Sequence, residues 1–214
     1  MPDLFINLVI LSLTWITYFA LHSLLAAIWM KDIIKDHFPS FAPHYRLAYN
    51  IISILLIIPV FRFAHSINSP PLIVWNGFFG AISGAVFILA CAGFFWTLRY
   101  YDMAQFLGLS QLRPKDAPAE GTELFTLSPL HRFVRHPWYF LALLILWTRD
   151  MNPPFLLTVV AVTIYFIIGS RLEERKLLYY YGKKYELYMK SVPGLVPLPW
   201  RYLRKEEADK IIAL

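Results

Sequence analysis

The sequence contains little charge and almost no cysteine. Charged residues make up 16% and hydrophobic residues 58% of the 214 residues, whereas a typical soluble domain is about 25% charged. The polar side chains are too few to cover a soluble globule, so the chain is expected to be an integral membrane protein. The same composition excludes intrinsic disorder. The single cysteine, Cys91, lies in an apolar run, which excludes a disulfide scaffold.

Signatures of metal and nucleotide sites are also missing. There is no pair of cysteines, and the six histidines show no metal-ligand spacing, so no metal site is expected. The sequence has neither a glycine-rich phosphate loop nor a nucleophile elbow. The net charge of +6 comes mainly from basic residues that flank the apolar segments, so it indicates membrane topology and not nucleic-acid binding.

Five apolar segments predict an all-α, polytopic integral membrane protein with about five transmembrane helices. Three long segments are expected at residues 4–30, 47–64 and 72–98. The first is about 40 Å long as a helix, enough to cross a bilayer with tilt. The last two, 137–147 and 155–170, form a short C-terminal helical hairpin. Its first arm is too short to cross about 30 Å of hydrocarbon upright.

Basic residues predict the orientation of the chain. Residues 31–46, expected as a surface loop, and residues 99–136 and 171–214 together hold 18 of the 20 Lys and Arg residues. Five spans place all three segments on one side, so the N-terminus is expected outside and the C-terminus in the cytosol, in the inner or plasma membrane of a bacterial host. Residues 1–98 are interpreted as an N-terminal three-span region, and residues 99–214, with the polar loop, the hairpin and the tail, as one structural unit.

A basic helix start and an acidic helix end are the candidates for chemistry. Arg135 and His136 precede Pro137, and the free N–H groups of a helix start favour an anion; the alternative is that they mark the membrane boundary. Glu173 and Glu174 point about 100° apart on a helix, and Glu174 can pair with Arg171, three residues before it. Such a run is also typical of a solvated helix end. The hairpin brings the clusters together, which suits a zwitterionic ligand.

Together these motifs resemble the isoprenylcysteine carboxyl methyltransferase superfamily. They are Arg135-His136-Pro137-x-Tyr139, Glu173-Glu174-x-x-Leu177, Tyr181-Gly182-x-x-Tyr185-x-x-Tyr188 and Val192-Pro193-x-Leu195-x-Pro197. The match covers roughly residues 124–199. The superfamily includes bacterial methanethiol S-methyltransferases and NnrU-like proteins, and its core is similar to that of phospholipid methyltransferases and sterol reductases.

The resemblance implies a membrane methyltransferase with S-adenosylmethionine as cofactor, bound in a pocket that opens to the cytosol. By position it implies cofactor contacts from Gln111, Leu124, Phe125, Thr126, His136, Pro137, Tyr139 and Glu173. His131, where relatives carry a tyrosine, and Arg135 complete the expected set. Glu173 is expected to bind the cofactor's amino group, and Arg135 and His136 its carboxylate. Arg171 and Glu174 are the expected catalytic residues, which orient the methyl acceptor.

The expected acceptor is a small thiol, or a hydrophobic or lipidated thiol or carboxylate, reached from the membrane lipid. Prenylcysteine-specific members carry an arginine four residues before the EE pair, where this chain has Gly169. This departure and His131 weigh against prenylcysteine. Two other functions stay open: an enzyme like the NADPH-dependent sterol reductases, which need more than five spans, and a non-enzymatic, NnrU-like transport or assembly factor.

Overall fold

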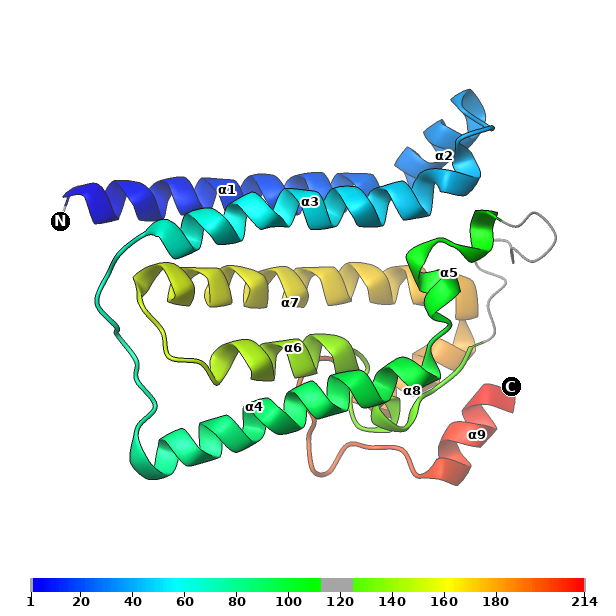
Figure 1. The fold of residues 1–214 in the computed structure, drawn as a ribbon. Coiled ribbons are helices and arrows are strands. Elements are labelled where there is room, and N and C mark those ends of the chain that lie inside the picture. The colour runs from blue at the N-terminus through cyan, green and yellow to red at the C-terminus, as the bar shows by residue number, and fades with distance from the viewer. Residues whose placement is uncertain (1, 113–124, 214) are drawn as a thin grey trace. The chain divides into compact units, whose positions relative to one another are not determined.

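The structure, a computed structural model, describes residues 2–112 and 125–213, and the elements in these ranges are helices (Figure 1). Four helices are long and apolar enough to span a membrane: Asp3–Ala26, Ala42–Ser66, Gly77–Tyr100 and Pro153–Tyr181. A shorter apolar helix covers Pro137–Trp147. The chain is therefore an all-α, polytopic membrane protein, as predicted. The α-helices are α1 (Pro2–Ala26), α2 (Ile28–His37), α3 (Tyr45–Ser66), α4 (Gly77–Thr97), α5 (Met103–Leu107), α6 (Pro137–Trp147), α7 (Pro153–Tyr181), α8 (Lys183–Ser191) and α9 (Lys205–Ala213).

Helix boundaries follow local chemistry and differ in places from the predicted ones. Proline occupies the first turn of α6, where its missing N–H group costs nothing. The side chain of Asn152 accepts a hydrogen bond from the backbone N–H of Phe155 (3.1 Å) and caps the start of α7. Gly182, with φ of 51°, ends α7. The prediction of a surface loop at residues 31–46 is wrong for its first half, because α2 extends to His37.

The described parts of Met1–Val74, Tyr101–Pro118 and Asp150–Ala161 form one compact unit. Here α1 and α3 pack antiparallel: the start of α3 lies beside the end of α1, where the Tyr45 hydroxyl donates to the carbonyl of Leu25 (2.7 Å). The buried Trp15 donates its Nε1 to Thr158 Oγ1 on α7 (3.1 Å). Polar groups within apolar helices are thus matched to one another.

The described parts of Trp75–Tyr100, Ala119–Arg149 and Val162–Leu214 form the second unit. Trp138 Nε1 donates to Thr97 Oγ1 (2.9 Å), so the end of α4 lies beside the start of α6. Gly93 permits the close approach of these helices, since a Cβ there would lie 3.2 Å from the Leu141 side chain. The two units are defined by which residues lie close together in space. The predicted division of the sequence into residues 1–98 and 99–214 stays a prediction.

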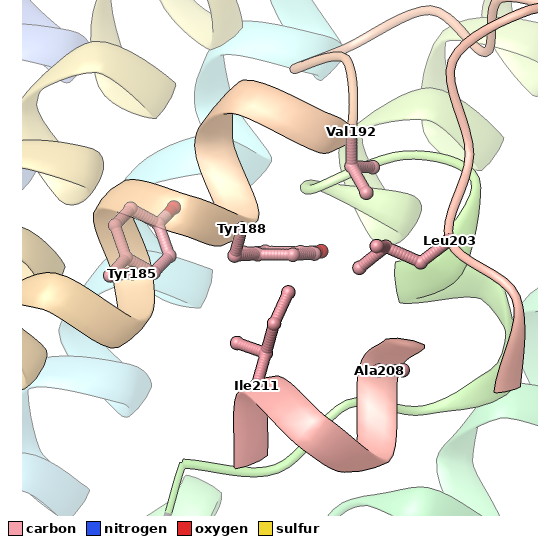
Figure 2. Packing of buried hydrophobic residues seen from close by; sticks show 6 residues of the cluster. All are labelled: Tyr185, Tyr188, Val192, Leu203, Ala208 and Ile211. Carbon is pink, nitrogen blue, oxygen red and sulfur yellow. The ribbon is translucent and has the colours of Figure 1, made fainter. Parts of the chain in front are cut away.

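The C-terminal part of the second unit has its own hydrophobic cluster (Figure 2). Its buried members come from α8, the tail and α9: Tyr185, Tyr188, Val192, Leu203, Ala208 and Ile211. Two hydrogen bonds connect the cluster to the short 3₁₀ helix Pro129–Arg132. Tyr188 Oη donates to the carbonyl of His131 (2.7 Å), and the N–H of Leu203 donates to the carbonyl of Arg132 (2.9 Å). The tail is thereby held next to the segment that leads into α6.

Candidate functional site

The candidate site lies where α6 begins, beside the charged part of α7, within the second unit. Ser128 is the N-cap of the preceding 3₁₀ helix, Pro129–Arg132, and its backbone N–H donates to the ring Nδ1 of His131 (3.2 Å). The chain then passes through Arg135 and His136 into α6. The charged run of α7 faces this start.

His136 lies between two carboxylates. Its Nε2 is 3.0 Å from Glu174 Oε1, and its Nδ1 is 3.4 Å from Glu173 Oε2. Burial disfavours the charged imidazolium, but the hydrogen bonds and charges of the two glutamates outweigh this effect and raise the pKa of His136 above its ordinary value. The predicted meeting of the basic helix start and the acidic pair therefore occurs in the structure.

Arg135 and Glu174 form an internal ion pair. Arg135 Nε and Nη2 lie 2.8 and 2.7 Å from Glu174 Oε1, and both side chains are nearly buried. Arg135 Nη1 donates to the carbonyl oxygens of Met189 and Val192. Most of the guanidinium donors are thus used inside the protein. The expected pairing of Glu174 with Arg171 is not found: Arg171 is exposed and makes no ion pair or hydrogen bond with other described residues.

The tail segment Val192–Gly194 completes this arrangement. The N–H of Arg135 donates to the carbonyl of Pro193 (2.8 Å), and the N–H of His136 to that of Gly194 (3.1 Å). A Cβ on Gly194 would lie 3.3 Å from Arg135 Nη2, so a larger residue there would require this guanidinium to shift by a few tenths of an ångström. We call Arg135, Glu174 and Val192–Gly194 the clamp. Sequence reasoning noted these tail residues only as part of a family motif and assigned them no place in the site.

Glu173 differs from Glu174 in its exposure. Its side chain is 47% exposed, and its Oε2 accepts a hydrogen bond from Tyr139 Oη (3.1 Å). The Tyr139 ring is stacked between two others, with centroids 5.3 Å from His136 and 4.5 Å from Phe166. Phe166 was missed by sequence reasoning; it stands seven residues before Glu173, which is two helical turns and so the same face. The result is an accessible carboxylate beside a stack of three rings.

The remaining predicted residues lie in several environments. Phe125 packs against Tyr181, with ring centroids 5.1 Å apart, at the edge of the hydrophobic cluster. Thr126 is exposed. Burial, followed by the charge of His136, lowers the pKa of His131 to about 4 against the opposing charge of Glu173, so the His131 ring is neutral at neutral pH.

Leu124 and Gln111 are the other two predicted residues. Leu124 lies outside the described residues. Gln111 belongs to the first unit, where its Nε2 donates to the carbonyl of Gln105 (3.4 Å). Its Oε1 is buried and has no hydrogen-bond partner among the residues that the structure covers. A cofactor contact from either residue stays a prediction. The described residues contain no group of three or more His, Cys, Asp or Glu side chains able to hold a metal ion.

The fold and the site define a polytopic, all-α membrane protein with a carboxylate and imidazole site at the start of a short apolar helix. The sequence is similar to curated methanethiol S-methyltransferases. It is 39% identical to the Pseudomonas deceptionensis enzyme over 90 residues, which are 42% of this chain and 33% of the relative. It is 29% identical to the Crocosphaera subtropica enzyme over 165 residues, 72% of this chain and 62% of the relative.

Methanethiol S-methyltransferase 2 of Bradyrhizobium diazoefficiens is 29% identical over 203 residues, which are 90% of this chain and 72% of that protein. These similarities confirm the predicted resemblance to the methanethiol S-methyltransferases. The matched region spans less than two thirds of the first two relatives. No family model matches the chain. No solved structure matches it either.

Proposed function

We propose that the chain is a membrane methyltransferase that transfers a methyl group from S-adenosylmethionine to a small thiol. The observation that carries the proposal is the accessible Glu173 carboxylate beside the stacked rings of His136 and Tyr139. The similarity to proteins named methanethiol S-methyltransferase supports the reaction class and the acceptor.

The chemistry of the site suits the cofactor. S-adenosylmethionine carries two cationic groups, an ammonium and a sulfonium, which are attracted by a carboxylate and by the faces of aromatic rings. Glu173 supplies such a carboxylate, and Tyr139 and Phe166 supply stacked aromatic rings next to it. When bound, the cofactor supplies an electrophilic methyl group. Glu173 would hold the ammonium group.

The other residues keep Glu173 in place. Tyr139 Oη and His136 Nδ1 both approach Glu173 Oε2, which fixes the direction of the carboxylate. Glu174 and Arg135 hold His136 and the tail, so their contacts favour a positioning role over the ligand-binding roles expected from the sequence. Precise alignment of the reacting groups can supply roughly 7–11 kcal/mol of the activation barrier, and it requires such rigid support.

A neutral thiol fits this site better than a carboxylate acceptor. A carboxylate needs a cationic partner, and the cations in contact with Glu173 and Glu174 are Arg135 and His136, whereas Arg171 bonds to neither glutamate. Arg135 is committed to Glu174 and to two backbone carbonyls, and His136 faces two glutamates. Recruiting either cation would break these contacts. A small thiol has no such requirement, and it can reach the site through the lipid or from water.

The membrane orientation is part of the proposal. The end of α4, the start of α6 and the charged part of α7 lie together, since Thr97 contacts Trp138 and His136 contacts Glu173. The basic residues that follow in the tail support a cytosolic location for this end, with the N-terminus outside.

Cofactor binding tests the proposal directly. S-adenosylmethionine and S-adenosylhomocysteine are titrated calorimetrically into detergent-purified protein, together with Glu173→Gln and the control Glu186→Gln, which changes an exposed glutamate of α8. We expect saturable binding that weakens at least tenfold in Glu173→Gln, corresponding to about 1.4 kcal/mol, and is unchanged in the control. Binding of NADPH alone would favour the reductase alternative. If S-adenosylmethionine, S-adenosylhomocysteine and NADPH, titrated in parallel, all fail to bind, a non-enzymatic factor is favoured.

A further inference from the structure

Large apolar side chains are exposed along the tail between α8 and α9. Val196 is 60% exposed, Trp200 75% and Tyr202 44%, and the Tyr202 ring stacks on Phe133, which is 41% exposed. Together these four residues form what we call the tail face. Large apolar side chains that stay exposed outside the membrane-spanning helices indicate an interaction surface.

The tail face lies at the level where an apolar helix begins. The tail residue Leu203 exchanges two hydrogen bonds with Arg132, one with its carbonyl and one with its Nε (2.9 Å each). The carbonyl of Gly194 accepts from the N–H of His136, immediately before the apolar helix α6 starts at Pro137. The tail face is therefore held within a few residues of the start of α6, at the expected boundary of the membrane. Tryptophan and tyrosine rings are enriched at this depth.

A basic hollow adjoins the tail face. It has a volume of about 580 Å³ and is open to solvent. Its charged and aromatic lining residues are Lys190, Trp200, Arg201, Tyr202, Glu207 and Lys210. Arg201 Nη2 donates to the backbone carbonyl of Lys190 (2.8 Å), and Lys190 Nζ lies 2.7 Å from Glu186 Oε1. Glu207 accepts a hydrogen bond from the backbone N–H of Arg204, at the start of α9 (2.7 Å). The lining residues thus comprise three cations and one carboxylate, and Glu186, which pairs with Lys190, lies outside the lining.

We propose that the hollow binds the headgroup of an anionic phospholipid of the membrane that the protein spans, with the tail face inserted in the interfacial layer. The lipid phosphate contacts Lys190, Arg201 and Lys210, while the rings of Trp200 and Tyr202 lie among the upper parts of the acyl chains. Charge complementarity assigns this occupant: three cations next to exposed aromatic rings, at the start of an apolar helix, match an anionic lipid surface. The site is separate from the cluster around Glu173 and does not depend on methyl transfer.

Quenching of tryptophan fluorescence tests this site. Detergent-solubilised protein is titrated with brominated phosphatidylglycerol or brominated phosphatidylcholine, and the contribution of Trp200 is obtained by difference from Trp200→Phe, since the chain has seven tryptophans. We expect Trp200 to be quenched by both lipids, at a much lower concentration of the anionic one. In Lys190→Gln/Lys210→Gln, the concentration of phosphatidylglycerol for half-quenching should rise about fivefold per removed charge, or roughly 25-fold.

The chain offers a matched control. Lys183→Gln/Lys205→Gln removes the same charge from the same two helices, and Lys183, like Lys190, pairs with Glu186, but neither lysine lines the hollow. The control should titrate like the wild type. Equal quenching by the two lipids, or an equal effect of the two double variants, would overturn the proposal. So would displacement of phosphatidylglycerol by millimolar inorganic phosphate, because the hollow would then be a site for soluble anions.

Discussion

The clamp makes a quantitative prediction for Glu174. One oxygen of this residue, Oε1, contacts Arg135 Nε, Arg135 Nη2 and His136 Nε2 at 2.7–3.0 Å. Glu174→Met preserves the length of the side chain but leaves the guanidinium nearly buried without its counter-charge. Removing one partner of a buried ion pair costs about 3–5 kcal/mol, because the other charge stays desolvated. We expect a loss of this size in the free energy of unfolding, and a smaller one for Glu174→Gln, which keeps an acceptor.

Equilibrium unfolding in mixed detergent micelles measures this loss, and a double-mutant cycle assigns it to the pair. Arg135→Met/Glu174→Met removes the unpaired charge together with its partner, so it should be more stable than the sum of the two single changes predicts, by about 1–3 kcal/mol. Glu186→Gln, which removes an exposed ion-paired carboxylate, should change stability little. Equal stability of Glu174→Met and Glu186→Gln, or additive single changes in the cycle, would refute the clamp.

Three other predictions follow from the same contacts. Gly194→Ala should destabilise the protein by about 1–3 kcal/mol and reduce methyl transfer, because the new Cβ would press on Arg135 Nη2. In the control Gly169→Ala the new Cβ meets open space, so thermal unfolding should find this variant as stable as the wild type or more stable. Because the pKa of His136 is raised in the folded protein, its protonation stabilises the fold fully below the ordinary pKa of 6.5, and this stabilisation is lost as the pH rises through the raised pKa. Unfolding midpoints measured from about pH 6 to about pH 9 should show the loss in the wild type and not in His136→Asn. Tyr139→Phe keeps the ring stack but removes the hydrogen bond to Glu173, so calorimetry should find cofactor binding weaker by about 0.5–1.5 kcal/mol with unchanged folding.

The membrane helices could be predicted from the sequence because hydropathy depends on short stretches of chain. Glu173 and Glu174 were expected to lie on a helix, and α7 does continue beyond its apolar part, up to Tyr181. Helix α2 was missed because its first three residues, 28–30, were assigned to the first apolar segment and the charged residues after them to a loop. Local patterns thus indicate where a helix can cross the membrane, but less reliably where a polar helix lies outside it.

The site could be predicted only in part, because its contacts join distant residues. The two motifs were expected to meet, and His136 does contact both glutamates. The partner of Glu174 was expected three residues away, at Arg171, yet the structure pairs it with Arg135, 39 residues away. Spacing along one helix says which side chains can meet, whereas burial decides which of them do. The tail contacts of Arg135 also depend on tertiary packing, so no local pattern indicated them.

Methyl transfer itself tests the central claim most directly. Purified protein is incubated with S-adenosylmethionine labelled in its methyl group and with methanethiol, and labelled dimethyl sulfide is collected from the headspace. We predict label in dimethyl sulfide with the wild type and with Glu186→Gln, and at least a tenfold slower reaction with Glu173→Gln. Wild-type protein that binds the cofactor but labels no thiol would contradict the proposed acceptor. Full activity in Glu173→Gln would contradict the proposed site.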